Sequence, residues 1–394
     1  MMLVGVHLAT SHAVRLHDWN IPPTNPALIE AAGWRQGRLA LDVGPEGRTA
    51  AHQRPWDTAV YHGRVYNVYP PLFTGLSLAA LILGGWQGVP PGVFYTPWLV
   101  AAVALPLPLV GFWAFQQVVR RAAWSAVLTA YLLLGTPLLP VLVGCRVGSI
   151  NAIHHALATT GLLLIAGDLL GRRRIWPAVI GLLIAAWSRQ PTLLYGLAIL
   201  WVAWRAGRRR TIVAAAGLAV AGGALMTLNW LRFDSPFDPG YRYIYAQGRK
   251  TQWYGARALA HGVLSPHFVP ENAWYMNLAP PRFRLSPAFI QQDNDNQGVS
   301  IWMTSPLLLG AFFGIRRWWR LQPARTLMLA SLPVILVFLM YHNPGTPQIG
   351  YFRFALDFLP VWLVVLAPWA VEGRRRTATL ACLTWSAWYF HLLV

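Results

Sequence analysis

The 394-residue sequence has little charge, almost no lysine and only two cysteines. Charged residues make up 11% of the chain, whereas about a quarter is usual in soluble globular domains. Cys145 and Cys382 lie in or beside apolar segments far apart in the sequence, so neither a disulfide framework nor a cysteine metal site is expected. The scarcity of charge excludes an ordinary soluble domain.

The chain is rich instead in apolar residues and arginine. The apolar set makes up 56% of the residues, and 21 residues are tryptophan. The formal net charge is +19, and every basic residue except Lys250 is an arginine. A disordered chain needs low hydrophobicity, and a nucleic-acid-binding chain needs basic residues on a solvated face, so this composition disfavours both. The charge is better explained by the topology of a membrane protein.

Apolar stretches separated by arginine-rich breaks predict an all-α, polytopic membrane protein. Several stretches reach the roughly 20 residues that cross a bilayer. They are 93–115, 122–144, 152–170, 175–187, 191–204, 211–231, 301–315, 326–342, 351–371 and 378–394. Together with a crossing from Met1 to about Arg15, they predict about 11 transmembrane helices in a single domain, 1–394. The break Ser188 to Pro191 favours two tilted half-length helices over one long helix.

The distribution of arginine predicts the orientation of these helices. Five breaks hold 16 of the 31 arginines, and successive breaks are separated by two apolar stretches, so all five lie on one side of the membrane. The positive-inside rule assigns that side to the cytoplasm. The opposite side carries 11 of the 13 acidic residues. We therefore expect a multi-pass protein of the inner (plasma) membrane with an extracytoplasmic active site.

Two long extracytoplasmic loops are predicted, at 17–92 and 232–300. The apolar piece 71–87 within the first loop is bounded by prolines and is short for a crossing. Counting it as a crossing would also move residues 17–70 to the cytoplasm. We therefore predict a helix at 71–87 that lies in the membrane interface.

Two carboxylates of the first loop are candidate general bases. Asp18 comes just after the first predicted crossing, where it could meet both an aqueous acceptor and a lipid-carried donor. It could equally cap or solvate a helix end. Asp57 is the competing candidate, and its alternative role is the N-cap of a short helix.

Three arginines outside the cytoplasmic breaks are candidate ligands for a phosphate group. They are Arg146 at a helix junction, Arg189 at the break between half-length helices, and Arg353 near the start of 351–371. A guanidinium group pairs with phosphate oxygens through two parallel hydrogen bonds. For Arg353 the alternative is a pair with Asp357 within one helix, at i,i+4 spacing.

The run from Tyr61 to Pro71 and the histidines near Arg146 add further candidates. The run is typical either of a sugar-binding surface or of an aromatic belt at headgroup depth. His154 and His155 are adjacent, so their side chains point apart on a helix, and no third residue is spaced to complete a metal site. The candidate substrate-binding residues from these segments are His62, Arg64, Tyr66, Tyr69 and His155.

Several short segments, spread over nearly the whole chain, carry a family resemblance. They are Gly37-Arg38-Leu39 with Asp42, Asp57 to Tyr66 with Tyr69 to Leu72, Ser188 to Pro191, Asn229 to Pro236 with Gly240-Tyr241, Gly298 to Ser300 with Thr304 to Pro306, and Tyr351 to Pro360. This set resembles polytopic glycosyltransferases of the C superfamily, the group of protein O-mannosyltransferases and lipid A aminoarabinose transferases, and especially its bacterial family-39-like members.

The resemblance implies a sugar donor on a polyprenyl phosphate and a catalytic Asp or Glu in the first external loop. It also implies an extracytoplasmic active site and interfacial helices in that loop. The sequence departs from the commonest pattern because Asp18 is followed by Trp19 rather than by a second acidic residue. Both Asp18 and Asp57 therefore stay open as the base.

We interpret the chain as an inverting membrane glycosyltransferase that moves a sugar from a polyprenyl phosphate to an acceptor glycan, lipid or protein. No cofactor, metal or nucleic acid is expected. The alternative is a transporter or flippase for a lipid-linked or anionic substrate. Such a protein typically has broken helices at matched positions of internal repeats, and only the break at 188–191 is found. A non-catalytic membrane scaffold is a third possibility.

Overall fold

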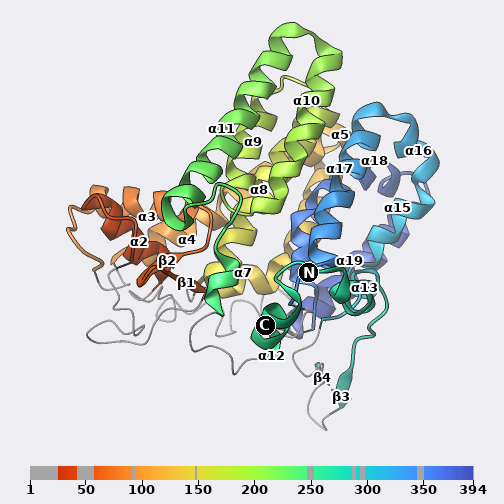
Figure 1. Cartoon of the computed structure of the whole chain (residues 1–394). Helices are drawn as coiled ribbons and strands as arrows, with labels where there is room; N and C mark the ends of the chain where they lie inside the picture. The colour runs from red at the N-terminus through yellow and green to blue at the C-terminus, as the bar shows by residue number, and fades with distance from the viewer. Residues whose placement is uncertain are drawn as a thin grey trace.

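The computed structural model describes residues 25–41, 57–90, 94–146, 149–245, 253–285, 290–292, 298–343 and 350–393. Most of these residues are helical, as the sequence predicts (Figure 1). The α-helices are α2 (Pro26–Arg35), α3 (Leu72–Leu83), α4 (Thr96–Ala104), α5 (Pro106–Val119), α6 (Ala122–Leu134), α7 (Leu138–Arg146), α8 (Ile150–Leu170), α9 (Trp176–Ala186), α10 (Tyr195–Ala206), α11 (Arg208–Phe233), α12 (Trp253–His261), α13 (Val269–Asn277), α14 (Ile301–Thr304), α15 (Gly310–Phe313), α16 (Ile315–Arg320), α17 (Gln322–Leu339), α18 (Leu359–Ala370) and α19 (Arg375–His391).

Short 3-10 helices and two small hairpins complete the described chain. The 3-10 helices are η4 (Gln190–Leu194), η5 (Tyr241–Ile244), η6 (Pro266–Phe268), η7 (Pro306–Leu309) and η9 (Arg353–Asp357). The strands are β1 (Thr58–Tyr61), β2 (Arg64–Asn67), β3 (Phe283–Leu285) and β4 (Ile290–Gln292), which pair as β1 with β2 and β3 with β4. The hairpins are a small departure from the predicted all-α class.

The described helices include several that are long and apolar enough to cross a membrane. Four qualify by length and composition: Thr96–Val119, which combines α4 and α5, together with α8, α11 and α17. The bent pair α6 and α7 makes a fifth if it counts as one span. A polytopic helical membrane protein is therefore confirmed, whereas the number of about 11 crossings stays a prediction.

Some predicted crossings are broken in the structure. The stretch 122–144 bends by 65° between α6 and α7, where Gly135 and Pro137 interrupt it. The stretch 301–315 divides into α14, η7 and α15, because Pro306 has no N–H with which to continue α14. The predicted separation of 175–187 from 191–204 is confirmed, since α9 ends at Ala186 and α10 begins at Tyr195.

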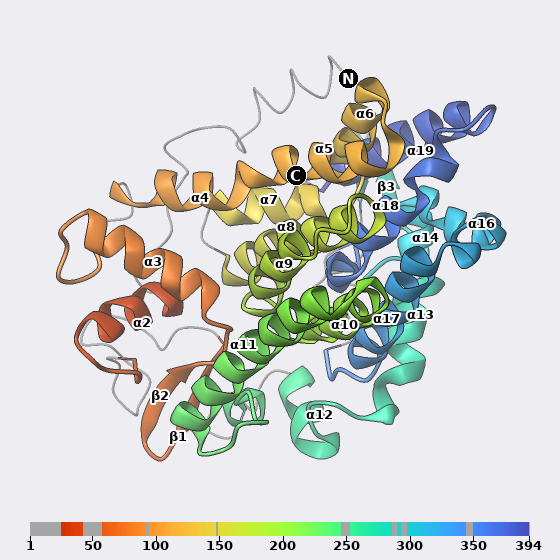
Figure 2. The same cartoon turned by 90° about the horizontal axis from the view of Figure 1, so that it is seen from above.

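Helix α8 is the central element of the bundle. It lies between α5 and α9 (Figure 2), and 89% of its apolar window is buried. Glycines allow a close approach between α8 and α9: a Cβ atom at Gly161 would lie 2.4 Å from the carbonyl oxygen of Gly181. Burial of α8 on all sides also encloses the side chains of His154, His155 and Asp168.

The first loop folds against the bundle through a tight hairpin and α3. His62 and Gly63 connect β1 to β2 with φ values of 47° and 73°, the positive values that a two-residue hairpin turn of type I′ requires. Figure 1 shows the hairpin, α2 and α3 gathered at one side of the bundle. The helix predicted at 71–87 is present as α3, and its placement in the membrane interface stays a prediction.

A buried ion pair fastens this loop to α11. Glu30 of α2 is fully buried and contacts the guanidinium group of Arg232, which is 3% exposed. Asn67 and Thr74 also donate hydrogen bonds to Glu30 Oε2, at 2.9 and 2.8 Å. Arg232 Nη1 donates to the backbone carbonyl of Tyr69 at 3.2 Å. The Glu30 carboxylate therefore joins α2 to Asn67 of β2, to α3 and to α11, and Arg232 fixes the backbone at Tyr69.

Replacing Glu30 by glutamine leaves the buried Arg232 without its counter-charge. We expect Glu30→Gln to lower the free energy of unfolding by about 3–5 kcal/mol, the usual cost of breaking a buried pair from one side. The measurement is equilibrium unfolding of the purified protein in mixed micelles. Glu372→Gln is the matched control: Glu372 pairs with Arg317 and Arg375 at an exposed site, and its loss should cost under about 1 kcal/mol. Equal losses in the two variants would contradict the structural role of Glu30.

Candidate functional site

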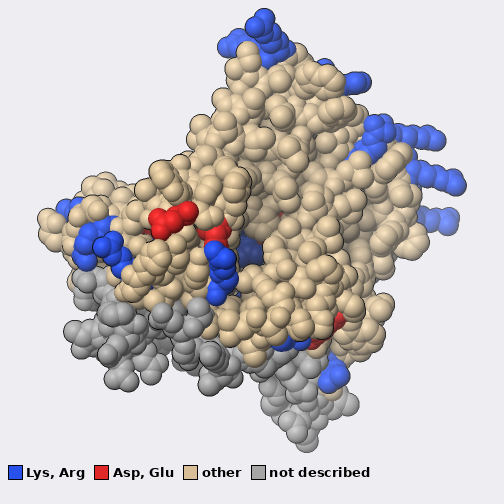
Figure 3. Space-filling model, viewed as in Figure 1, with Lys and Arg blue, Asp and Glu red and all other residues tan. Residues whose placement is uncertain are grey.

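A cavity of about 610 Å³ opens where the first loop, the α9–α10 break, the end of α17 and η9 meet. Figure 3 shows it as a hollow in the middle of the molecular face, with a basic side chain in its depth. Its lining is apolar in part, through Pro70, Val337, Phe338 and Phe354. The polar and charged lining includes Asp57, Tyr69, Asn151, Arg189, Asp238, Tyr241, Arg242, Tyr341 and Arg353.

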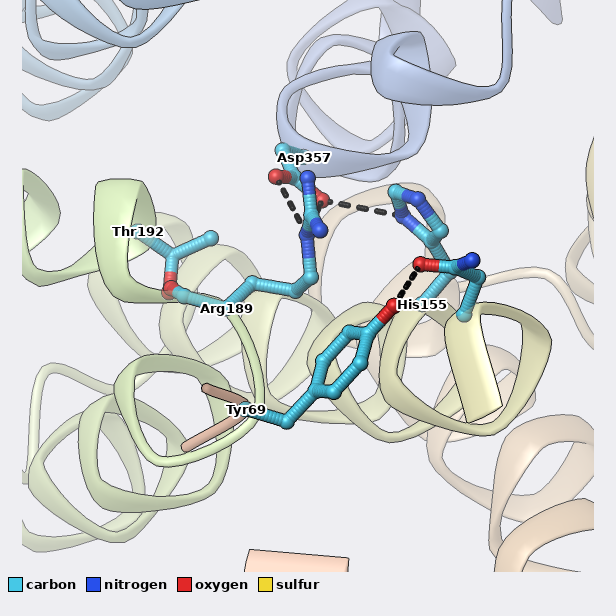
Figure 4. Close-up of polar contacts among 6 residues, drawn as sticks. Tyr69, His155, Arg189, Thr192 and Asp357 are labelled. Carbon is cyan, nitrogen blue, oxygen red and sulfur yellow. Dashed lines mark hydrogen bonds and ion pairs between the residues drawn. The ribbon is translucent and has the colours of Figure 1, made fainter. Parts of the chain in front are cut away.

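An ion pair between two breaks in the helical pattern forms one wall. Arg189 Nε donates to both oxygens of Asp357, at 3.0 Å to Oδ2 and 3.3 Å to Oδ1 (Figure 4). His155 Nδ1 of α8 lies 3.2 Å from Asp357 Oδ1. The side chains of Asp357 and His155 are fully buried, and that of Arg189 is 10% exposed. Asp357 is thus held from two elements and supplies the counter-charge of Arg189.

Prolines explain why Arg189 and Asp357 leave regular helix at this place. Pro191 lies in the first turn of η4, where no N–H is needed, and Arg189, the N-cap of that turn, is extended at φ −141° and ψ 102°. Pro360 likewise lies in the first turn of α18, just after η9 ends at Asp357. Both side chains therefore project from chain breaks into the space between helices.

The ion pair also orients the guanidinium group of Arg189. Its plane lies near the rings of Phe338 and Phe354, with 5.5 and 5.6 Å from Cζ to the ring centroids. Only Nε contacts Asp357, and the two terminal nitrogens donate no hydrogen bond to any residue that the structure describes. Because Arg189 lines the cavity, these nitrogens are available to an anion there.

Another part of the cavity lining presents a carboxylate held by a buried tyrosine. The Tyr69 hydroxyl lies 2.7 Å from Asp57 Oδ2 and 2.6 Å from Asn151 Oδ1. A phenol has one proton, so both contacts are satisfied when the Asn151 amide group turns its NH₂ toward the phenol and Tyr69 donates to Asp57. The Tyr69 ring stacks on His154 with 4.9 Å between ring centroids. Asp57 has a positive φ of 55°, an uncommon value for a residue other than glycine.

Three tyrosines of the cavity stay protonated at neutral pH. Burial raises the pKa of Tyr69 and of Tyr341 well above the ordinary value. Burial raises the pKa of Tyr241 to about 12, although the neighbouring Arg189 acts to lower it. Tyr241 and Tyr341 can therefore donate hydrogen bonds to a bound polar molecule, whereas Tyr69 donates its proton to Asp57.

The structure brings together several residues that the sequence singles out. Asp57, Tyr69, Arg189 and Arg353 line the same cavity, and His155 lies behind its wall against Asp357. Their roles in binding or catalysis stay predictions. Arg353 stands over the ring of Phe354, with 5.4 Å from Cζ to the ring centroid.

Other predicted residues lie elsewhere or outside the described chain. His62 is exposed at the hairpin turn and lies 3.7 Å from Asp234, and Arg64 is exposed next to it. Tyr66 is buried against Phe233, with 5.6 Å between the ring centroids. None of these three lines the cavity. Asp18 and the side chain of Arg146 lie outside the described residues.

Two alternative roles considered for these residues are wrong. An i,i+4 pair of Arg353 with Asp357 does not form, because 353–357 is a 3-10 helix and Asp357 contacts Arg189 and His155 instead. Asp57 does not cap a helix, since it directly precedes strand β1.

The sequence analysis names none of Tyr241, Tyr341 and Asn151 as a candidate site residue, although Tyr241 belongs to the segments that carry the family resemblance. Tyr241 and Tyr341 follow α11 and α17 in segments whose fold gives no periodic signal. Within the described residues there is no group of three or more His, Cys, Asp or Glu side chains that could hold a metal ion.

Comparisons with known proteins give one structural match. No protein-family model matches the sequence, and no curated protein matches it. A crystal structure of ArnT from Cupriavidus metallidurans bound to undecaprenyl phosphate is similar with a TM-score of 0.45 and 14% identity. The match covers 96% of this chain and 62% of that chain, so this chain spans less than two-thirds of its length. Similarity of this degree identifies neither a family nor a function.

The coupling of Arg189 to Asp357 is measurable by a double-mutant cycle. Asp357→Asn and Arg189→Gln should each cost about 3 kcal/mol or more of unfolding free energy, because each leaves one partner buried without compensation. The double variant should cost less than the sum of the two, by more than about 1 kcal/mol. Additive losses in mixed-micelle unfolding would show that the two side chains do not stabilise each other.

Proposed function

We propose that the chain transfers a sugar from a polyprenyl-phosphate donor to an acceptor hydroxyl at this cavity. The observation that carries the proposal is that Arg189, Arg353 and Asp57 line one cavity, in addition to Arg242 and Asp238, which pair with each other. A lipid-phosphate sugar needs cationic groups for its phosphate, and its acceptor needs a base. The apolar part of the lining suits the lipid nearest the phosphate.

Arg189 carries the phosphate-binding role. Its Nε donates a hydrogen bond to Asp357, and this bond fixes the direction of the guanidinium group. The terminal nitrogens are thereby left for a ligand in the cavity that Arg189 lines. A guanidinium group whose orientation is set in advance loses less freedom on binding an anion. Arg353 adds a second positive charge to the same cavity. As the donor bond breaks, these charges stabilise the phosphate that leaves.

Among the described residues that line the cavity, Asp57 is the candidate base. Tyr69 holds its Oδ2, while its Oδ1 accepts no hydrogen bond from any other described residue. In the proposed step the acceptor hydroxyl gives its proton to Asp57, and the acceptor oxygen forms a bond to the anomeric carbon. The bond from that carbon to the phosphate oxygen breaks, and its electron pair leaves with the polyprenyl phosphate. A single displacement inverts the anomeric configuration. Asp18 is the competing base.

The distribution of charge supports an extracytoplasmic site. In Figure 3, two groups of arginine side chains gather at edges of the molecule, over the α10–α11 connection and over α16, and the hollow lies away from both. Further basic side chains lie on the side of α2 and beside the hollow. The two edges carry arginine-rich breaks that the positive-inside rule assigns to the cytoplasm.

Replacing Asp57 by asparagine tests the base. We expect Asp57→Asn to reduce turnover by about 100-fold or more, because general base catalysis contributes about that much, while donor binding is retained. The measurement is release of free polyprenyl phosphate from radiolabelled polyprenyl-phosphate sugars. Asp234→Asn, an exposed carboxylate that does not line the cavity, is the control and should stay within twofold of the original chain. Full turnover in Asp57→Asn would remove this residue from the mechanism and favour Asp18.

Replacing Arg189 by lysine tests the phosphate ligand. Lysine keeps the charge but loses the planar, two-pronged donor, so we expect roughly tenfold weaker binding of polyprenyl phosphate. Binding is measured by titration in detergent micelles, with Arg210→Lys on the exposed start of α11 as control. Unchanged affinity would contradict the assignment of Arg189 as a phosphate ligand.

Movement of the intact donor across the bilayer of liposomes, without cleavage of the sugar–phosphate bond, would instead support a transporter.

A further inference from the structure

A second groove lies at the other end of α8 from the cavity. Its floor is the C-terminal end of α8, and its walls are α5 and α9, which flank α8 in Figure 2. It encloses about 400 Å³. Asn151, in the cavity, and Asp168, in the groove, are 17 residues apart on one helix, or about 25 Å at 1.5 Å per residue. The groove is therefore a separate site.

The walls of the groove are apolar and face outward. Leu109 of α5 is 71% exposed, and Ile180 of α9 is 42% exposed. Val110 and Trp113 continue the α5 wall, and Trp176 stands at the start of α9. In a membrane-spanning bundle, such a surface is covered by acyl chains, and tryptophan is typical of the depth where chains meet headgroups.

Two arginines stand at the end of this apolar groove. Arg172 and Arg174 line it and are exposed. Neither guanidinium group donates a hydrogen bond or forms an ion pair within the part of the chain that the structure describes. Arg173, which is also exposed, lies between them in the sequence.

The nearest carboxylate, Asp168, offsets only part of this charge. Asp168 is 2% exposed and accepts hydrogen bonds from the backbone N–H groups of Arg174 and Ile175, at 3.0 and 2.8 Å. It is thus engaged in shaping the turn that leads into α9. One buried carboxylate facing three arginines leaves a net positive charge at the end of the groove.

We propose that this groove binds an anionic phospholipid. Arg172 and Arg174 contact the headgroup phosphate, and an acyl chain lies along Leu109, Val110 and Ile180. The combination of charge and apolar surface selects this ligand: a soluble phosphate would use only the arginines, and a zwitterionic lipid would gain little from their net charge. Basic pockets between membrane helices bind anionic lipids in this way. The inference does not depend on the proposed transferase activity.

Lipid binding to the full chain in detergent, followed by native mass spectrometry, tests the proposal. Phosphatidylglycerol should bind at one retained site, and Arg172→Ala/Arg174→Ala should weaken it by about 25-fold, or about fivefold for each arginine. The control is Arg208→Ala/Arg209→Ala, a pair of exposed arginines outside the groove, which should change the affinity by less than twofold. Equal loss in the two double variants would overturn the proposal, since it would indicate attraction by the general positive charge.

Three further measurements separate the lipid from other ligands. Phosphatidylcholine should bind at least tenfold more weakly than phosphatidylglycerol, and equal binding would overturn the role of the arginines. Glycerol 3-phosphate, which has the headgroup chemistry but no acyl chain, should not displace the lipid, and displacement would overturn the role of the groove. Val110→Trp, which fills the groove but keeps both arginines, should weaken phosphatidylglycerol binding, and unchanged affinity would place the acyl chain elsewhere.

Discussion

The buried pair of Arg189 and Asp357 is the interaction on which the cavity depends. A guanidinium group inside a membrane protein is costly unless it meets a counter-charge or a polar cavity, and Arg189 has both. Asp357 is held in turn by His155 of the central helix α8. The pair ties the α9–α10 break to the start of α18, so two breaks in the helical pattern become one wall of a site. The terminal nitrogens of Arg189 then face the cavity.

A second buried pair, Glu30 with Arg232, supports the part of the cavity lining that carries Tyr69 and Asp57. It fastens the first loop to α11, and Arg232 also bonds the backbone carbonyl of Tyr69. Tyr69 in turn orients Asp57. Each wall is thus built from a carboxylate and an arginine that are removed from water. The cavity between these elements holds both a candidate base and a candidate anion ligand, as the proposed transfer from a lipid phosphate requires.

Apolar periodicity predicts the helical membrane class and most of the long helices, because burial in lipid requires apolar segments of bilayer length. The residues Ser188 to Pro191 predict the break that exposes Arg189, although α17 and α18 continue past Pro333 and Pro368. Periodicity does not predict which distant residues meet. Asp357 lies three positions before Pro360, so it sits outside the regular helix in which pairing with Arg353 would be expected, and its partners come from α8 and the α9–α10 break. The hairpin that carries Asp57 depends on a turn at His62-Gly63 within a loop that has no helical period.

A structure of the chain with bound polyprenyl phosphate tests the central claim most directly. We predict that the phosphate lies in the cavity, within hydrogen-bond distance of a terminal nitrogen of Arg189, with the Arg189–Asp357 pair intact. A phosphate bound elsewhere, with the terminal nitrogens of Arg189 still uncontacted, would contradict it.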